Sequence, residues 1–160
     1  MKKCILICDD DEDILHVCKL ILEKNNFRVV TSDNCEDIFD TMETTMPDLI
    51  LMDVWIPEMG GEAATKKLKT LELTKQIPVI LLSAHKELDV VAQRASADGF
   101  IQKPFEISEL LNKINTYVYP KDNNQTNFSN IAEAILRFFT LKKTTNALSI
   151  HHHLKELKFR

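Results

Sequence analysis

Five short apolar runs, each followed by a helical pattern, constrain the fold of this 160-residue chain more strongly than any other feature. The runs lie at 4–8, 27–31, 48–53, 78–83 and 99–102, and continuous apolar runs of this length are typical of buried strands. Strand and helix alternating five times predict a parallel sheet with helices on both faces. We therefore expect the α/β class, a doubly wound (βα)5 fold with a five-stranded parallel sheet, followed by a C-terminal helical extension.

The segments between the runs repeat apolar residues every three or four positions, which indicates amphipathic helices. The expected third helix runs from about Glu62 to Leu73, and Asp11 or a neighbouring acid is expected to cap the first helix. The other apolar stripes are Ile14, Val17, Cys18 and Ile21; Cys35, Ile38, Phe39 and Met42; Leu88, Val91, Ala92 and Ala95; and Ile107, Leu110, Leu111, Ile114 and Val118.

Composition narrows the class of protein. The chain is 44% apolar and 28% charged, an ordinary globular mixture. No apolar run approaches the ~20 residues of a membrane span, and the basic start turns acidic at Asp9, too early for a signal-peptide core. We expect a cytoplasmic protein whose four cysteines, none in a CxxC pair, are reduced and partly buried.

The charge is unevenly distributed along the chain. Residues 1–120 carry 13 Lys and Arg against 21 Asp and Glu, whereas residues 121–160 carry 7 against 3. An acidic surface repels the phosphate backbone of nucleic acids. No nucleic acid is therefore expected to bind residues 1–120.

Polar side chains collect where the expected strands end. Asp9 and Asp10 follow the first run, Asp53 ends the third, Ser83 ends the fourth and Lys103 follows the fifth. Carboxyl ends of parallel strands meet at one edge of the sheet, where sites form in such folds. Each residue alone has an ordinary interpretation, such as a helix cap or a solvated lysine. Their combination at one edge is what indicates a site.

The residue types at this edge suit phosphoryl transfer. Gathered carboxylates repel one another and need a cation, and Mg²⁺ is commonly held by one or two carboxylates together with a phosphate. A lysine and a hydroxyl supply the donors that phosphoryl oxygens require. A carboxylate can itself be the nucleophile and form an aspartyl phosphate.

Four segments carry a family resemblance: ILICDDD at 5–11, LMDVWIPEMGG at 51–61, ILLSA at 80–84 and GFIQKPF at 99–105. Their identity, order and spacing resemble the receiver domain of two-component response regulators over about residues 2–120. The resemblance implies a flavodoxin-like fold in which residues 1–120 form the receiver domain. It also implies that Mg²⁺ is the cofactor.

The resemblance implies roles for the site residues. Asp53 resembles the phosphoacceptor. Asp10 resembles a direct Mg²⁺ ligand, while Asp9 would act mostly through metal-bound water. The remaining implied roles are a metal-ligating main-chain carbonyl at Trp55, a phosphate-pairing ammonium at Lys103, a phosphate-binding switch hydroxyl at Ser83 and an aromatic switch at Phe100.

The resemblance also implies partners. A sensor histidine kinase or phosphotransfer protein would donate the phosphoryl group. Phosphorylation would then change the face formed by the fourth helix, fifth strand and fifth helix, which would bind an unidentified downstream protein or a second copy of this chain.

Three aromatic positions leave alternatives open. Phe100 stands where many relatives have Tyr, and it can instead be read as a core residue. Trp55 either shields the acyl phosphate from water or contacts a partner at the surface. His85 lies two residues after Ser83, where it either modulates access to the site or is an ordinary surface residue, and His16 is expected to be solvated.

The C-terminal forty residues form a separate part of the sequence. Residues 121–127 are polar and are expected to be a linker. In 128–160, Phe128, Ile131, Ile135 and Phe138 recur at helical spacing, which predicts an amphipathic helical tail and no independent domain. Such a tail can pack on the receiver, dimerise, or bind a partner or a membrane surface; we expect packing or dimerisation.

The expected function is a response regulator that switches protein–protein interactions and is not an enzyme, although it would catalyse its own phosphorylation and dephosphorylation. Two alternatives remain at this point. One is a transcription regulator that binds DNA through the basic tail. The other is a phosphate-ester hydrolase that uses Asp53 as its nucleophile.

Overall fold

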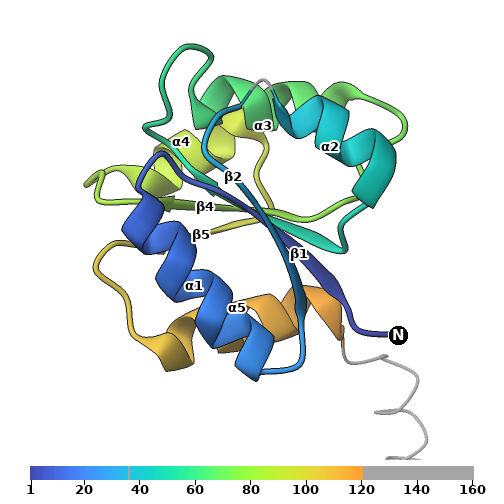
Figure 1. Cartoon of the computed structure of the whole chain (residues 1–160). Coiled ribbons are helices and arrows are strands. Elements are labelled where there is room, and N and C mark those ends of the chain that lie inside the picture. Colours follow the sequence, from blue (N-terminus) through green and yellow to red (C-terminus); the bar gives the residue numbers. More distant parts are fainter. Residues whose placement is uncertain (36, 121–160) are drawn as a thin grey trace, which may run out of the picture. The chain divides into compact units, whose positions relative to one another are not determined.

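The computed structural model describes residues 1–35 and 37–120, in which strands and helices alternate along the chain (Figure 1). The predicted linker at 121–127 and tail at 128–160 lie outside the described residues. The elements are β1 (Cys4–Cys8), α1 (Glu12–Lys24), β2 (Arg28–Ser32), α2 (Asp37–Thr45), β3 (Leu49–Asp53), α3 (Gly61–Thr70), β4 (Val79–Ser83), α4 (Leu88–Ala95), β5 (Gly99–Gln102) and α5 (Ile107–Val118).

The five strands form one parallel sheet in the order β2-β1-β3-β4-β5. In the register, Ile5 pairs with Leu49 across β1 and β3, and Ile50 pairs with Val79 across β3 and β4. The chain moves outward from β1 to β2 and then returns to the other side of β1. The strand order therefore reverses between β1 and β3, where such sheets place their sites. The predicted α/β doubly wound fold is confirmed.

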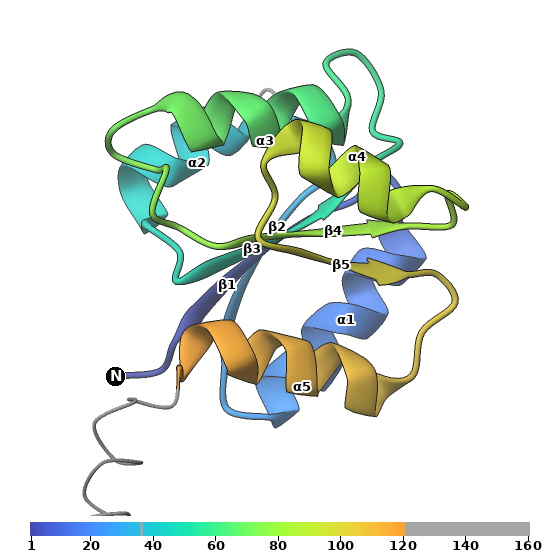
Figure 2. The same cartoon turned by 180° about the vertical axis from the view of Figure 1, so that it is seen from behind.

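Helices cover both faces of the sheet, with α1 and α5 on one face and α2, α3 and α4 on the other (Figures 1 and 2). Alternate residues of β1 serve the two cores, as strand geometry requires. Ile5 and Ile7 pack with buried residues of α1 and α5, whereas Leu6 and Cys8 pack with those of α2, α3 and α4. All four cysteines are free and buried.

The predicted apolar stripe of α1 is partly wrong, whereas its predicted cap is confirmed. The buried face of α1 consists of Leu15, Cys18 and Leu22, while Val17 is 53% exposed. Successive helical residues are rotated by about 100°, so a helix that buries Cys18 turns Val17 away from the sheet. The Asp11 side chain caps α1 as predicted, by accepting from the N–H groups of Asp13 and Ile14.

Helix α3 ends at Thr70 and not at Leu73, because Leu71 has an extended backbone. The Thr74 hydroxyl donates to the carbonyl of Leu68 at 2.7 Å, and Lys69 Nζ donates to the carbonyl of Ile77 at 2.7 Å. These bonds fix the turn that leads into β4. No helix within the described part of the chain is long and apolar enough to cross a membrane.

Candidate functional site

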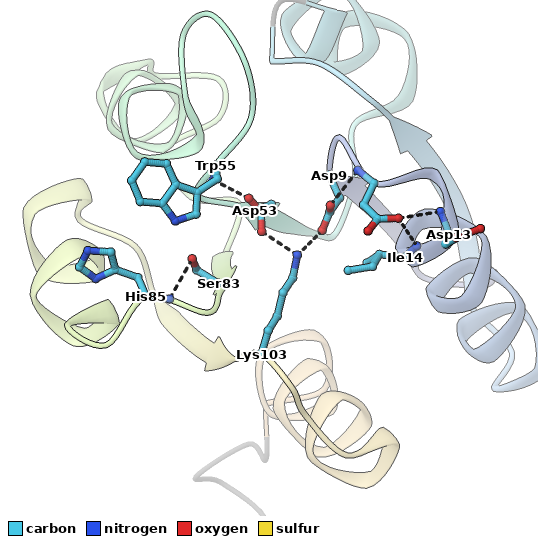
Figure 3. Close-up of polar contacts among 9 residues, drawn as sticks. Asp9, Asp13, Ile14, Asp53, Trp55, Ser83, His85 and Lys103 are labelled. Atoms are coloured by element: carbon cyan, nitrogen blue, oxygen red, sulfur yellow. Dashed lines mark hydrogen bonds and ion pairs between the residues drawn. The ribbon is translucent and has the colours of Figure 1, made fainter.

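Three side chains from three strand ends meet at the carboxyl edge of the sheet (Figure 3). Lys103 Nζ, just after β5, lies 2.6 Å from Asp9 Oδ2, just after β1. The same nitrogen lies 2.7 Å from Asp53 Oδ1, at the end of β3. The structure thus brings together three of the predicted site residues, separated by up to 94 positions in the sequence.

The two carboxylates at this site are buried, with Asp9 1% and Asp53 4% exposed. Burial raises the pKa of Asp9, and the negative charge of Asp53 acts in the same direction against the influence of Lys103. For Lys103, burial alone would lower the pKa, but the hydrogen bonds to Asp53 and Asp9 outweigh it and raise the pKa. One ammonium therefore neutralises only part of the buried negative charge.

The loop after β3 holds the second oxygen of the Asp53 carboxylate. The main-chain N–H of Trp55 donates to Asp53 Oδ2, and the N–H of Gly61 donates to the carbonyl of Val54 at 3.1 Å. A Cβ atom at Gly61 would lie 1.7 Å from the main-chain oxygen of Asp53, so only glycine fits at the start of α3. The loop is thereby folded tightly against the end of β3.

The three consecutive acids after β1 have different environments. Asp9 Oδ1 accepts from the N–H of Asp11 at 3.1 Å, and Asp11 caps α1. Asp10 is exposed and does not join the ion pairs of Lys103. The structure thus places Asp9 inside the cluster and Asp10 at its solvent side.

Ser83 is fully buried at the end of β4. Its carbonyl accepts from the N–H of Lys103 at 2.8 Å, and its hydroxyl oxygen accepts from the N–H of His85 at 3.3 Å. The simpler reading of Ser83 as a helix cap is wrong, because the N-cap position of α4 is Glu87. The hydroxyl is positioned beside the site by the same β4–β5 pairing that positions Lys103.

The aromatic positions are not buried. Phe100 is 39% exposed on β5, with Lys113 Nζ 5.8 Å from its ring centroid, so the core alternative is wrong. Trp55 is 66% exposed, and its ring centroid lies 6.1 Å from that of His85, which is half-buried. His16 is exposed, as predicted.

Sequence reasoning missed the cavity of about 490 Å³ beside Trp55. Its lining includes Val54, Ile56 and Val91 together with the ion pair of Glu62 and Arg94, whose N–O distance is 2.9 Å. No local pattern predicts this cavity, because α3 and α4 bring the two partners together from 32 positions apart.

The donor set at this edge fits Mg²⁺ by its chemistry. The carboxylate oxygens of Asp9 and Asp53 meet here, and the exposed Asp10 follows Asp9 directly; carboxylates are the hard oxygen ligands that this ion prefers. Within residues 1–35 and 37–120, no three acidic, Cys or His side chains are already gathered in one metal-binding group. A site of one or two carboxylates, a carbonyl and several waters suits the habit of Mg²⁺ of keeping much of its hydration.

Comparisons with known proteins agree on one family. The family model described as response regulator receiver domain matches residues 5–115. PhoP of Bacillus subtilis, an alkaline phosphatase synthesis transcriptional regulatory protein, is 34% identical over 112 residues, which are 69% of this chain and 46% of PhoP. CpxR of Escherichia coli, a transcriptional regulatory protein, is 37% identical over 112 residues, 69% of this chain and 47% of CpxR.

A solved receiver-domain structure has the same fold as this chain. The receiver domain of the sensor histidine kinase PA1611 from Pseudomonas aeruginosa, crystallised with magnesium in its active-site cleft, superimposes with a TM-score of 0.68 at 23% identity, covering 74% of this chain and 98% of that one. The chain spans about half the length of the curated relatives it matches. The matched segment, the strand order and the strand-end residues together establish that this chain belongs to the response regulator receiver domain family of two-component systems.

Proposed function

We propose that this chain is a phosphorylation-controlled switch in which Asp53 accepts a phosphoryl group from a sensor histidine kinase or phosphotransfer protein. One observation carries the proposal: the buried Asp53 carboxylate is held by Lys103 on one oxygen and by the Trp55 N–H on the other, with Asp9 beside it. A carboxylate fixed in this way is oriented for attack on phosphorus.

The transfer itself needs little chemistry from the protein. An Asp53 carboxylate oxygen forms a bond to phosphorus while the P–N bond of the donor phosphohistidine breaks, and the leaving imidazole takes up a proton. Lys103 is close enough to Asp53 to pair with the transferred phosphoryl oxygens and to offset their charge. The chain therefore contributes mainly position and electrostatics.

Mg²⁺ is the cofactor we propose, held by Asp10 and Asp53, by the main-chain carbonyl of Trp55, and by Asp9 mostly through metal-bound water. When bound, the ion supplies positive charge that offsets the negative charge of the phosphoryl oxygens. The partly neutralised carboxylates, with the raised pKa of Asp9, support the need for such a cation.

The output is a change in protein–protein interaction. The buried Ser83 hydroxyl would turn toward the phosphoryl oxygens, and Phe100, exposed on neighbouring β5, would move inward. The face of α4, β5 and α5 would then bind a downstream protein or a second copy of the chain. We place this switch in the cytoplasm, where the four free cysteines suit a reducing environment.

The test is incubation of the full chain with Mg²⁺ and acetyl phosphate, followed by intact mass spectrometry. The wild type should gain one phosphoryl group, and Asp53→Asn should gain none. Asp48→Asn is the matched control, because it makes the same chemical change at the opposite end of β3 and should label like the wild type. Equal labelling of Asp53→Asn and wild type would contradict the proposal, and sustained release of phosphate from a phosphate monoester would favour a hydrolase instead.

A further inference from the structure

An apolar cavity of about 340 Å³ lies between α2 and the loop that joins α3 to β4. The two helices are neighbours on one face of the sheet (Figures 1 and 2). The apolar lining consists of Phe39, Met42, Met46, Leu71 and Leu73. None of the strand-end site residues lines this cavity, so a ligand there would be independent of the proposed role of Asp53.

Three apolar side chains of this cavity are exposed at its opening. Leu73 is 82%, Met46 55% and Leu71 41% exposed, and they adjoin the half-buried Phe39 and the buried Met42. Met46 has a φ of 42°, in the left-handed region that favours glycine. A strained backbone position thus carries a large apolar side chain that faces solvent. Exposed apolar side chains gathered in this way mark binding sites, whereas single ones do not.

The loop side of the cavity is held in place by the loop's own hydrogen bonds. The hydroxyl of Thr74, which is 6% exposed, donates to the carbonyl of Leu68 at 2.7 Å. The N–H groups of Thr74 and Lys75 donate to the carbonyl of Leu71 at 3.1 and 2.8 Å. The wall is therefore formed before a ligand arrives, and binding would order few further groups.

The charges beside the cavity favour an anion. Lys67 Nζ lies 4.0 Å from the ring centroid of Phe39, which places an ammonium at the α2 side of the cavity. None of the ion pairs found within residues 1–35 and 37–120 includes Lys67. Glu72, the acid in the lining, is already paired with Lys75 at 2.7 Å. Lys67 is thus the described charge that an anionic head group would complement.

We propose that this cavity binds a soluble medium-chain fatty acid, with its unbranched acyl chain between α2 and the α3–β4 loop and its carboxylate on Lys67. The cavity volume of about 340 Å³ is at the small end of the range of ligand pockets, about 300–1,000 Å³. Met42 and Met46 suit such a chain, because unbranched thioether side chains adapt their shape to a flexible apolar ligand. The ligand is held without any covalent step.

The five methionines of the chain provide a direct test. The full chain, labelled with ¹³C at its methionine methyl groups, is titrated with decanoate below the concentration at which decanoate forms micelles. The NMR signals of Met42 and Met46 should shift and saturate. Those of Met1, Met52 and Met59 should stay in place, because these residues do not line the cavity.

A series of chain lengths tests the acyl part of the ligand. From hexanoate through octanoate to decanoate, each added methylene should tighten binding by up to about fourfold, the equivalent of burying one CH₂ group. Decylamine has the same chain length with a cationic head, and it should bind more weakly than decanoate.

Two variants with matched controls test the position of the ligand. Lys67→Gln should weaken decanoate binding about three- to fivefold, while Lys66→Gln, the exposed neighbour on α3, should stay within about 1.5-fold of wild type. Leu73→Asn should weaken it about fivefold, and Leu20→Asn, at an exposed apolar position of α1, should not. All four side chains are exposed, so the unliganded variants should melt near the wild-type temperature.

Four outcomes would overturn the proposal. Signals of Met42 and Met46 that do not respond to decanoate would exclude the site, and equal shifts of all five signals would show non-specific binding. Decylamine binding as tight as that of decanoate would remove the role of Lys67. Met42 and Met46 signals that respond only to vesicles of anionic phospholipid, or only to protein concentration, would assign this surface to a membrane or to a second copy of the chain.

Discussion

Lysine–aspartate ion pairs occur at both edges of the sheet, the amino edge where the strands begin and the carboxyl edge where they end, but the ratio of lysine to aspartate differs. At the amino edge, Lys3 pairs with Asp48 at 2.8 Å, and the N–H of Cys4 also donates to Asp48 at 2.8 Å. Lys69 pairs with Asp98 there, and the N–H of Val79 donates to the same carboxylate at 2.7 Å. Each aspartate at this edge has its own lysine and its own backbone donor.

At the carboxyl edge, one lysine serves two buried aspartates. The pKa values reflect the difference. Burial would raise the pKa of Asp48, but Lys3 and the Cys4 N–H lower it overall, whereas the pKa of Asp9 is raised. Complete pairing stabilises a fold, while incomplete neutralisation leaves a demand for added positive charge. This contrast distinguishes the candidate site from a structural cluster of the same composition.

The largest expected effect is that of removing magnesium, which should slow the chemistry at the carboxyl edge and leave the amino edge unaffected. With excess EDTA, the rate of labelling by acetyl phosphate should fall about a thousandfold, because the ion supplies several kcal/mol of charge stabilisation. The thermal stability contributed by the amino-edge pairs should not change. Labelling time courses with and without EDTA check this, and restoration by added Mg²⁺ is the control. Equal labelling rates with and without EDTA would show that phosphorylation of this chain does not require the metal.

Substitution of Lys103 at the carboxyl edge should slow phosphorylation less than removal of magnesium does, and substitution of Lys3 at the amino edge should hardly slow it. Lys103→Met should slow phosphorylation about a hundredfold, as expected for loss of one positioned charge donor. Lys3→Met, the same change at the amino edge, should leave the rate within about twofold. Initial rates of labelling measure both variants. A similar decrease of the labelling rate in both variants would show that loss of folding, and not the position of the Lys103 charge, slows phosphorylation.

The free energy of unfolding should depend on the ion pairs of the amino edge. Asp48→Asn should destabilise the fold by about 1 kcal/mol at neutral pH, since hydrogen bonds to a charged group are lost at a partly exposed site. The folded pKa of Asp48 lies below its ordinary 3.8, so this stability is present above 3.8 and lost as the pH falls through the lowered pKa. Urea unfolding at several pH values tests it; a difference that persists in strong acid would contradict it.

The smallest expected effect is a gain in stability at the carboxyl edge, in contrast to the loss expected for Asp48→Asn. Asp9→Asn should raise the melting temperature by about 2 °C in EDTA, because the folded chain disfavours a charge there and Lys103 keeps Asp53 as a partner. The folded pKa of Asp9 lies above 3.8, so the gain is complete above that raised pKa and disappears as the pH falls toward 3.8. Calorimetry of wild type and variant in chelator measures it, and a lower melting temperature at neutral pH would be the contrary result.

Much of the carboxyl edge could be predicted from sequence, because strand ends in a parallel sheet converge by topology. Asp9, Asp53, Ser83 and Lys103 each follow or end an apolar run, and the structure places them at one edge. Which acid of a consecutive set points inward depends on the turn that starts α1, so the exposure of Asp10 was not predictable from the pattern.

Other features depend on contacts that no local pattern encodes. The pairing of Lys3 with Asp48 joins residues 45 positions apart, and the contact of Trp55 with His85 joins two loops. Helical spacing predicted the buried residues of α4 correctly but misplaced Val17 on α1, because periodicity defines a stripe without fixing its rotation against the sheet.

The most direct test is to locate the phosphoryl group itself. After labelling with acetyl phosphate and Mg²⁺, borohydride reduction converts an acyl-phosphate aspartate into homoserine, and tandem mass spectrometry of the digest identifies the position. We expect homoserine at position 53 alone, and only after labelling in the presence of Mg²⁺. Homoserine at position 9 or 10, or at no position in a protein that had gained the mass of a phosphoryl group, would contradict it.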